Sequence, residues 1–342
     1  MRICLLGKSL TNLVLANVLA NKKLEVDIYY TSKLVLQKTD SPRTLAISNE
    51  NYSYLKKNKK KLNIKSWPTQ KIDIYTEKKN SEKLMPALFV GHGSPMNGIL
   101  DNEFSQKWST LAYKIPKPAA VLVVSAHWYT KGTKVTAMDF PATIHDFGGF
   151  PRELFEVQYK APGNPELAKE TSALIKSTSV ELDHEWGLDH GAWVIVKHMY
   201  PNADIPVLQL SIDYTKPPTY HYQLAQELYE LRKKGVLIIG SGNMVHNLRM
   251  VAWDKINDNY GYDWALELNQ KFKSLIESKD HDSLIHYKNL GQAANLAIPS
   301  PDHYLPLLYT LGLQGKKDEI SFFNDKAVAG SLTMTSVELN AL

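Results

Sequence analysis

The sequence is short of cysteine and of long apolar runs. Cys4 is the only cysteine among 342 residues, which excludes an internal disulfide and every cysteine-based zinc motif. No apolar run approaches the roughly 18 residues that cross a bilayer, and the segment after Met1 has a strand-like pattern instead of a cleavable signal. We therefore expect a cytoplasmic protein without membrane contact, in which any metal ion is bound by histidine and carboxylate side chains.

The composition is that of a globular protein, with 44% hydrophobic and 22% charged residues. The net charge of +5 is unevenly distributed: residues 1–84 hold 17 Lys and Arg against 7 Asp and Glu, and the rest holds 23 against 28. The basic excess centres on residues 56–61 (KKNKKK). Such a run is most often a solvated face, so we expect no nucleic-acid partner.

A change of composition near residue 85 divides the sequence in two. Residues 71–83 are polar and rich in Lys and Glu, and a new apolar run begins at Met85. Before this boundary, residues 2–6 and 25–30 have strand patterns and residues 10–20 have helical periodicity, which is the opening of a βαβ unit. We expect a small appendage over residues 1–84 and one α/β domain over residues 85–342.

The appendage has a glycine after its first strand, as dinucleotide-binding domains do. Their fingerprint uses three glycines, for a tight turn, for approach to the pyrophosphate and for helix packing. Residues 7–12 (GKSLTN) keep only Gly7. With residues 41–48 (SPRTLAIS), the segment resembles the start of the flavin-dependent monooxygenases of ubiquinone biosynthesis. Because two glycines are missing, we interpret it as a truncated Rossmann-like piece without its own cofactor.

Beyond residue 85, apolar runs alternate with helical patterns. The runs at 85–90, 119–124, 205–212 and 236–239 are typical of strands, and the segments 165–177, 192–200 and 220–233 of helices. This alternation predicts an α/β fold with a mostly parallel central sheet and helices on both faces.

Three of the clearest apolar runs lead to a histidine. Residues 88–93 (LFVGHG), 121–128 (VLVVSAHW) and 237–246 (LIIGSGNMVH) supply His92, His127 and His246. The carboxyl ends of parallel strands lie at one edge of a sheet, where ligands bind. Neutral imidazole is the commonest metal ligand and suits both zinc and iron. The pattern therefore predicts a metal site at this edge.

Other histidines lie near turns. His190, within residues 186–193 (WGLDHGAW), precedes a helix, where it is either structural, a further metal ligand or a general acid/base. His145, in the aromatic loop 143–151 (TIHDFGGFP), and His303, in residues 301–306 (PDHYLP), are as much pocket candidates as ordinary loop residues. We expect surface or packing roles for the remaining histidines: His184, His198, His221, His281 and His286.

Taken together, these segments resemble the bacterial and plant 4,5-DOPA extradiol dioxygenases, which belong with the class III ring-cleaving dioxygenases. The motifs are residues 91–96 (GHGSPM), 125–128 (SAHW), 144–151 (IHDFGGFP), 189–191 (DHG), 242–247 (GNMVHN) and 303–308 (HYLPLL), and their order and spacing agree over residues 85–338. The resemblance implies an α/β sheet domain in which His92, His127 and His246 bind the metal, with His190 as a further ligand or the acid/base.

The resemblance also implies a reaction. A DOPA-like catechol chelates Fe(II) beside O2, and the ring is opened to a semialdehyde, with His190 moving protons and His145 or His303 orienting the diol. Zn(II) also occurs in this family but cannot activate O2. The expected partners are thus the catechol and O2, in a monomer or small homo-oligomer. Two alternatives stay open: a zinc-dependent hydrolase using the same histidines, and a non-catalytic module that binds a metal or peptide.

Overall fold

The computed structural model describes residues 2–6, 25–29, 84–256 and 258–341. The chain divides into two compact units, Met1–Tyr75 and Thr76–Leu342. In the first unit, β1 (Arg2–Leu6) and β2 (Glu25–Tyr29) pair in parallel, which confirms the two predicted strands. The predicted helix at 10–20 and the basic run at 56–61 lie outside the described residues. The interpretation of residues 1–84 as a cofactor-free appendage stays a prediction.

The second unit alternates strands and helices along most of its length. Its strands are β3 (Ala87–Gly91), β4 (Ala120–Thr130), β5 (Thr133–Thr136), β6 (Ala142–Thr143), β7 (Val180–Asp183), β8 (Gly187–Leu188), β9 (Val207–Asp213), β10 (Val236–Gly242), β11 (Asp318–Phe323), β12 (Ala327–Val328), β13 (Leu332–Thr333) and β14 (Ser336–Ala341). Its helices are α3 (Glu103–Lys114), α4 (Arg152–Phe155), α5 (Pro165–Leu174), α6 (His190–Met199), α7 (Pro218–Glu227), α8 (Tyr229–Lys233), α9 (Asp263–Glu277), α10 (His281–Ile285), α11 (Gln292–Ala297) and α12 (Leu305–Gly312), with 3-10 turns η1 (Pro95–Gly98), η2 (Leu248–Met250), η3 (Trp253–Lys255) and η4 (Tyr287–Leu290).

The central sheet has eight strands in the order β11-β14-β3-β10-β4-β9-β5-β7. Its middle four strands, β3, β10, β4 and β9, run parallel. At one side β14 is antiparallel to β3 and β11 is antiparallel to β14; at the other, β5 is antiparallel to β9 and pairs with β7 in parallel. The mostly parallel sheet is confirmed, and its mixed edges were not predicted.

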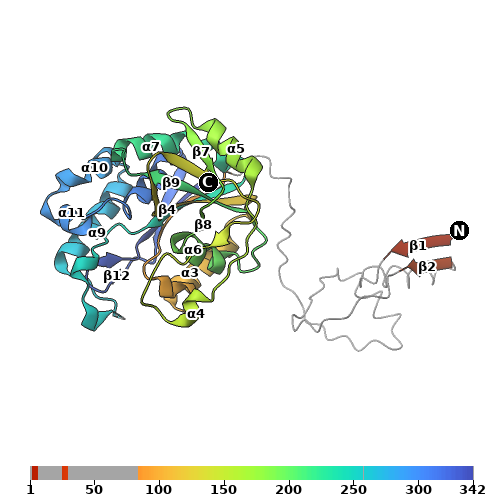
Figure 1. The fold of residues 1–342 in the computed structure, drawn as a ribbon, viewed down its shortest axis with the longest axis horizontal. Helices are drawn as coiled ribbons and strands as arrows, with labels where there is room; N and C mark the ends of the chain where they lie inside the picture. The colour runs from red at the N-terminus through yellow and green to blue at the C-terminus, as the bar shows by residue number, and fades with distance from the viewer. Residues whose placement is uncertain (1, 7–24, 30–83, 257, 342) are drawn as a thin grey trace, which may run out of the picture. The chain divides into compact units, whose positions relative to one another are not determined.

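Helices cover both faces of this sheet, as predicted (Figure 1). Along β3, Ala87 and Phe89 belong to one apolar core and Leu88 and Val90 to the other. The first core also takes residues from α5, α7, α9, α11 and α12, and the second from α3, α4 and α6. Because both faces are buried, the inner strands read as continuous apolar runs without alternation.

Three elements differ from expectation, and the first two contribute residues to the site described below. The strand expected at 119–124 continues to Thr130 as β4, with a register shift between Val124 and Tyr129. The helix expected from residue 192 begins at His190, because the Asp189 side chain accepts a hydrogen bond from the Ala192 N–H and caps it. The helix expected at 220–233 is divided at Leu228 into α7 and α8. None of the helices in the described part of the chain is long and apolar enough to span a membrane.

Candidate metal centre

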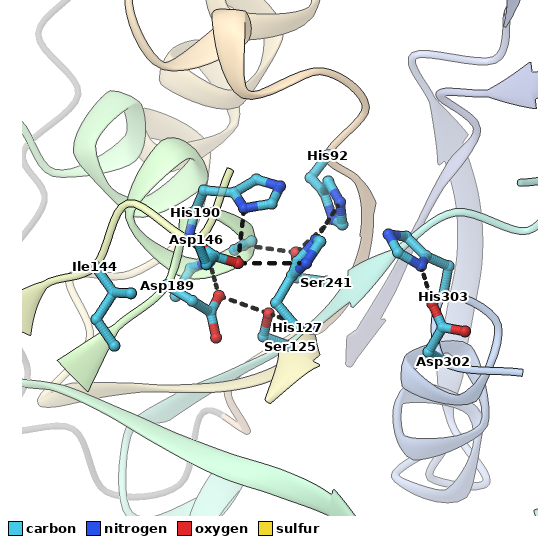
Figure 2. Close-up of polar contacts among 12 residues, drawn as sticks. His92, Ser125, His127, Ile144, Asp146, Asp189, His190, Ser241, Asp302 and His303 are labelled. Atoms are coloured by element: carbon cyan, nitrogen blue, oxygen red, sulfur yellow. Dashed lines mark hydrogen bonds and ion pairs between the residues drawn. The ribbon is translucent and has the colours of Figure 1, made fainter. Parts of the chain in front are cut away.

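Three histidines from separate segments meet at the carboxyl edge of the parallel strands (Figure 2). His92 directly follows β3, His127 lies within β4 at its register shift, and His190 opens α6. One ring nitrogen from each lies within 4.8 Å of the other two. The expectation that His127 follows its strand was wrong, because β4 continues past it to Thr130.

A close backbone approach brings α6 to β4. A Cβ atom on Gly191 would lie 2.4 Å from the Ser125 Oγ and 3.0 Å from the His127 ring. Only a residue without a side chain fits between the helix start and the strand. His190 therefore reaches His127, and the centroids of their rings are 3.8 Å apart.

The hydrogen bonds of His92 define which of its nitrogens carries the proton. The Ser241 Oγ donates to the Gly191 carbonyl oxygen at 2.6 Å and lies 3.0 Å from the His92 Nδ1. Since a hydroxyl has one hydrogen, Ser241 must accept the second bond, and the His92 Nδ1 must donate it. This leaves a lone pair on the His92 Nε2, which faces the centre of the cluster.

His127 and His190 share one carboxylate. The Asp146 Oδ2 lies 3.4 Å from the His127 Nδ1 and 3.0 Å from the His190 Nδ1. Burial raises the pKa of Asp146, but the close contact and charge of the His190 ring, with the hydrogen bond from the His190 backbone N–H, outweigh this effect and lower the pKa overall. The carboxylate is therefore ionised near neutral pH and favours a proton on the Nδ1 of both rings.

The cluster fits a bound cation. The Nε2 atoms of His92 and His127 are 3.1 Å apart. With hydrogen on the Nδ1 of both rings, two lone pairs meet at this distance and repel unless a cation accepts both. Burial, followed by the charges of the neighbouring imidazoles, lowers the pKa of both rings well below the ordinary histidine value. Both rings are thus neutral, which is the form that binds metal. An all-nitrogen donor set suits zinc or ferrous iron.

His246 and His303 lie beside this three-histidine cluster. Their rings stack with centroids 3.6 Å apart and an interplanar angle of 4°. The centroid of the His303 ring lies 5.2 Å from that of His92 and 5.0 Å from that of His127. Burial, followed by the charge of His303, lowers the pKa of His246 to about 3. The group within 4.8 Å contains His190 and not His246, so the predicted ligand role of His246 stays a prediction.

His145 lies outside the cluster. Its Nε2 is 3.0 Å from the Val157 carbonyl oxygen, and its ring packs near Phe147, Phe155 and Trp193. Phe147 reaches the cluster instead, with its ring edge-on to His190 at 5.6 Å. The predicted role of His145 in orienting a diol therefore gains no support from this geometry and stays a prediction.

The sequence analysis missed the polar residues that support the histidines. Asp189 is fully buried, caps α6 and accepts from the Ser125 Oγ at 2.7 Å. Burial, followed by the charge of Asp146, raises the pKa of Asp189 to about 6. Asp146 and Asp189 each lie next to a candidate histidine in the sequence, and this adjacency was the available signal. Ser241 carries no comparable signal, because serine within a strand is common.

Comparisons with known proteins cover most of the second unit. Residues 86–335 match the family model described as the catalytic LigB subunit of aromatic ring-opening dioxygenase. The chain is 45% identical over 263 residues to the 4,5-DOPA dioxygenase extradiol of Escherichia coli K12, covering 76% of this chain and 96% of that protein. The protein of the same name from Beta vulgaris is 34% identical over 269 residues, covering 77% and 99%. The crystal structure of an uncharacterized E. coli K12 protein matches with a TM-score of 0.65 and 41% identity, covering 75% of this chain and all of that one.

Proposed function

The chain belongs to the LigB family of aromatic ring-opening dioxygenases, and from this premise we propose that it cleaves a DOPA-like catechol beside the diol with O2 and releases a ring-opened semialdehyde. The match covers 250 residues of the second unit, from 86 to 335. The relatives named for DOPA cleavage are matched over nearly their full length. The family gives the reaction class, aromatic ring opening. The DOPA-like catechol as substrate and O2 as oxidant are our proposal.

The observation that carries the proposal is the pair of neutral imidazoles, His92 and His127, whose Nε2 atoms lie 3.1 Å apart with His190 beside them. We propose that His92, His127 and His190 hold ferrous iron, with His246 as a candidate for a further ligand. When bound, the iron would supply the electron transfer between an electron-rich ring and dioxygen, which zinc cannot do.

The side chains around the ion have separate roles in this proposal. His190 is buried and its Nδ1 faces Asp146, so its Nε2 can either bind the ion or carry a proton for a substrate oxygen, but not both. We propose the ligand role. Phe147 provides an apolar wall next to His190. His303 lies beside His92 and His127 and pairs through its Nδ1 with Asp302, and we assign it the orientation of the second diol oxygen. In this proposal, these side chains exclude water and hold the catechol ring in the orientation needed for reaction.

The test is anaerobic reconstitution of the full chain with Fe(II), followed by DOPA or another catechol and then air. We expect a yellow semialdehyde absorption together with O2 uptake. A zinc-loaded sample is the matched control, and it should give neither signal. Absence of colour and O2 uptake with every catechol tested would reject the proposal. Hydrolysis of esters or amides by the zinc-loaded sample would instead support a zinc hydrolase.

We also propose that residues 85–342 form the catalytic domain. Met85 is buried, its backbone N–H donates to the Arg232 carbonyl oxygen at 3.0 Å, and the Arg232 Nε donates to the Met85 carbonyl oxygen at 2.6 Å. These two hydrogen bonds join Met85 to the end of α8 and make it part of the second unit's fold. A chain that starts at Met85 should retain turnover and thermal stability; an insoluble or inactive truncation would show that the preceding residues are needed.

A further inference from the structure

We propose that Asp146 is a positioning residue that holds the rings of His127 and His190 in the tautomer with hydrogen on Nδ1, so that the Nε2 of each is free for the metal ion. The inference rests on the metal site of the proposed function. It assigns a specific role to a carboxylate that neither binds the ion nor touches the substrate in that proposal.

The two oxygens of Asp146 make different contacts (Figure 2). The Oδ1 accepts a hydrogen bond from the His190 backbone N–H at 2.9 Å. The Oδ2 faces the two ring nitrogens, 3.4 Å from the His127 Nδ1 and 3.0 Å from the His190 Nδ1. The first contact anchors the loop between β6 and α4 to the start of α6. The second pair of contacts is not needed for that anchor.

The two histidines depend on this carboxylate more than His92 does. Ser241 fixes the tautomer of His92 through a bond of its own. The His190 Nδ1 is buried and has no hydrogen-bond partner among the described residues, and its 3.0 Å contact with Asp146 is an ion-pair contact without hydrogen-bond alignment. The negative charge on Oδ2 is therefore what favours hydrogen on this nitrogen. A carboxylate behind a ligating imidazole also raises the basicity of the ligand.

The same loop delivers a second element to the site. Phe147 follows Asp146 directly and packs edge-on against His190 at 5.6 Å. One short segment thus sets both the electrostatics behind His190 and the apolar surface beside it. Any displacement of this loop would change ligand geometry and substrate contact together.

The substitution Asp146→Asn separates positioning from anchoring. The asparagine Oδ1 can still accept the His190 backbone hydrogen bond, whereas an NH2 group replaces Oδ2, removes the charge and donates where the carboxylate accepted. We expect zinc affinity of the metal-free protein to fall about 10- to 100-fold, the usual effect of losing an outer partner of a metal ligand. The ring ¹⁵N NMR spectrum of histidine-labelled metal-free protein should show His127 and His190 moving toward the form with hydrogen on Nε2.

The matched control is Asp139→Asn, which makes the same chemical change at an exposed position seven residues earlier. Its zinc affinity, ring ¹⁵N spectrum and turnover should equal those of the unsubstituted protein. If Asp146→Asn does not fold, Asp146→Glu serves instead: it keeps the charge, moves it by one methylene, and should weaken zinc binding while the circular dichroism spectrum stays unchanged.

Zinc affinity within twofold of the unsubstituted value, with unchanged ring ¹⁵N shifts, would overturn the positioning role and leave Asp146 as a loop anchor. The two proposals fail separately, because zinc binding and NMR need no turnover. If the unsubstituted protein opens no catechol but Asp146→Asn still loses zinc affinity, the proposed reaction is wrong and the positioning role stands.

Discussion

Buried polar groups lie at both edges of the sheet, and they are arranged in opposite ways. At the amino edge, Arg232 and Asp318 form a fully buried pair joined at 2.6 Å. The guanidinium also donates to the carbonyl oxygens of Met85 and Leu313, both at 2.6 Å, and the Asp318 Oδ2 accepts from the Gly315 N–H. The charges and hydrogen-bonding groups of this pair are matched within the chain, so we assign it a structural role.

At the carboxyl edge, the buried histidines are matched only on their outer side. Ser241 and Asp146 face the Nδ1 atoms, while the Nε2 atoms of His92 and His127 face each other at 3.1 Å. The two edges thus hold two kinds of buried polar network. A network whose donors and acceptors are all paired stabilises the fold, whereas one that leaves nitrogen atoms facing each other on one side marks a ligand-binding site. Substitutions at the two edges should therefore have different effects.

The largest effect is expected at His127. The substitution His127→Ala removes a central ligand, so turnover should fall at least about 1000-fold, because metal catalysis supplies several kcal/mol. Metal content should fall with it. The melting temperature of the metal-free protein should stay within a few degrees, since neutral imidazoles repel one another less once one is removed. Metal analysis and calorimetry check this; a variant that keeps stoichiometric metal and turnover would contradict the site.

The next effect is expected at the amino edge. Asp318→Asn leaves Arg232 buried without a counter-charge, which should lower the free energy of unfolding by about 3–5 kcal/mol. Zinc affinity of the folded variant should remain within twofold. Denaturant titration measures the first quantity and zinc titration the second. The matched control is Asp204→Asn, which breaks an exposed pair with Lys117 and should cost less than about 1 kcal/mol. Equal losses of unfolding free energy in the two variants would show that the buried pair contributes no more to stability than an exposed one.

A smaller effect is expected at Ser241. Ser241→Ala frees the His92 ring to adopt either tautomer, so zinc affinity should fall about 10- to 100-fold while unfolding free energy falls by only about 1 kcal/mol. Ser105→Ala is the comparison, because that hydroxyl bonds within the start of α3; it should lose stability and keep zinc affinity. Similar zinc affinities in both variants would show that Ser241 does not set the tautomer.

The sequence was sufficient to predict the parallel sheet and the proximity of His92 and His127, because apolar runs and the residues that follow them are local patterns. It named His190 only as structural, a further ligand or an acid/base, because the position of its ring depends on how closely Gly191 lets α6 approach β4. The place of Asp146 was also hidden, since a loop residue acquires its role only from the two rings that the fold brings to it. The stacking of His246 on His303 likewise joins segments 57 residues apart with no shared periodicity.

The smallest effect on stability at neutral pH is expected at His221, a buried histidine outside the metal centre. Its side chain is fully buried, its Nδ1 lies 3.0 Å from the Tyr309 hydroxyl, and burial lowers its pKa from 6.5 to about 4. The folded protein therefore takes up this proton less readily than the unfolded chain, so the stability contribution is complete above pH 6.5 and is lost as the pH falls through 4. His221→Asn keeps a polar atom near Tyr309 and does not titrate. The stability of the unsubstituted protein relative to this variant should decrease between pH 7 and pH 4 in denaturant titrations, and a pH-independent difference would mean that His221 is not held neutral.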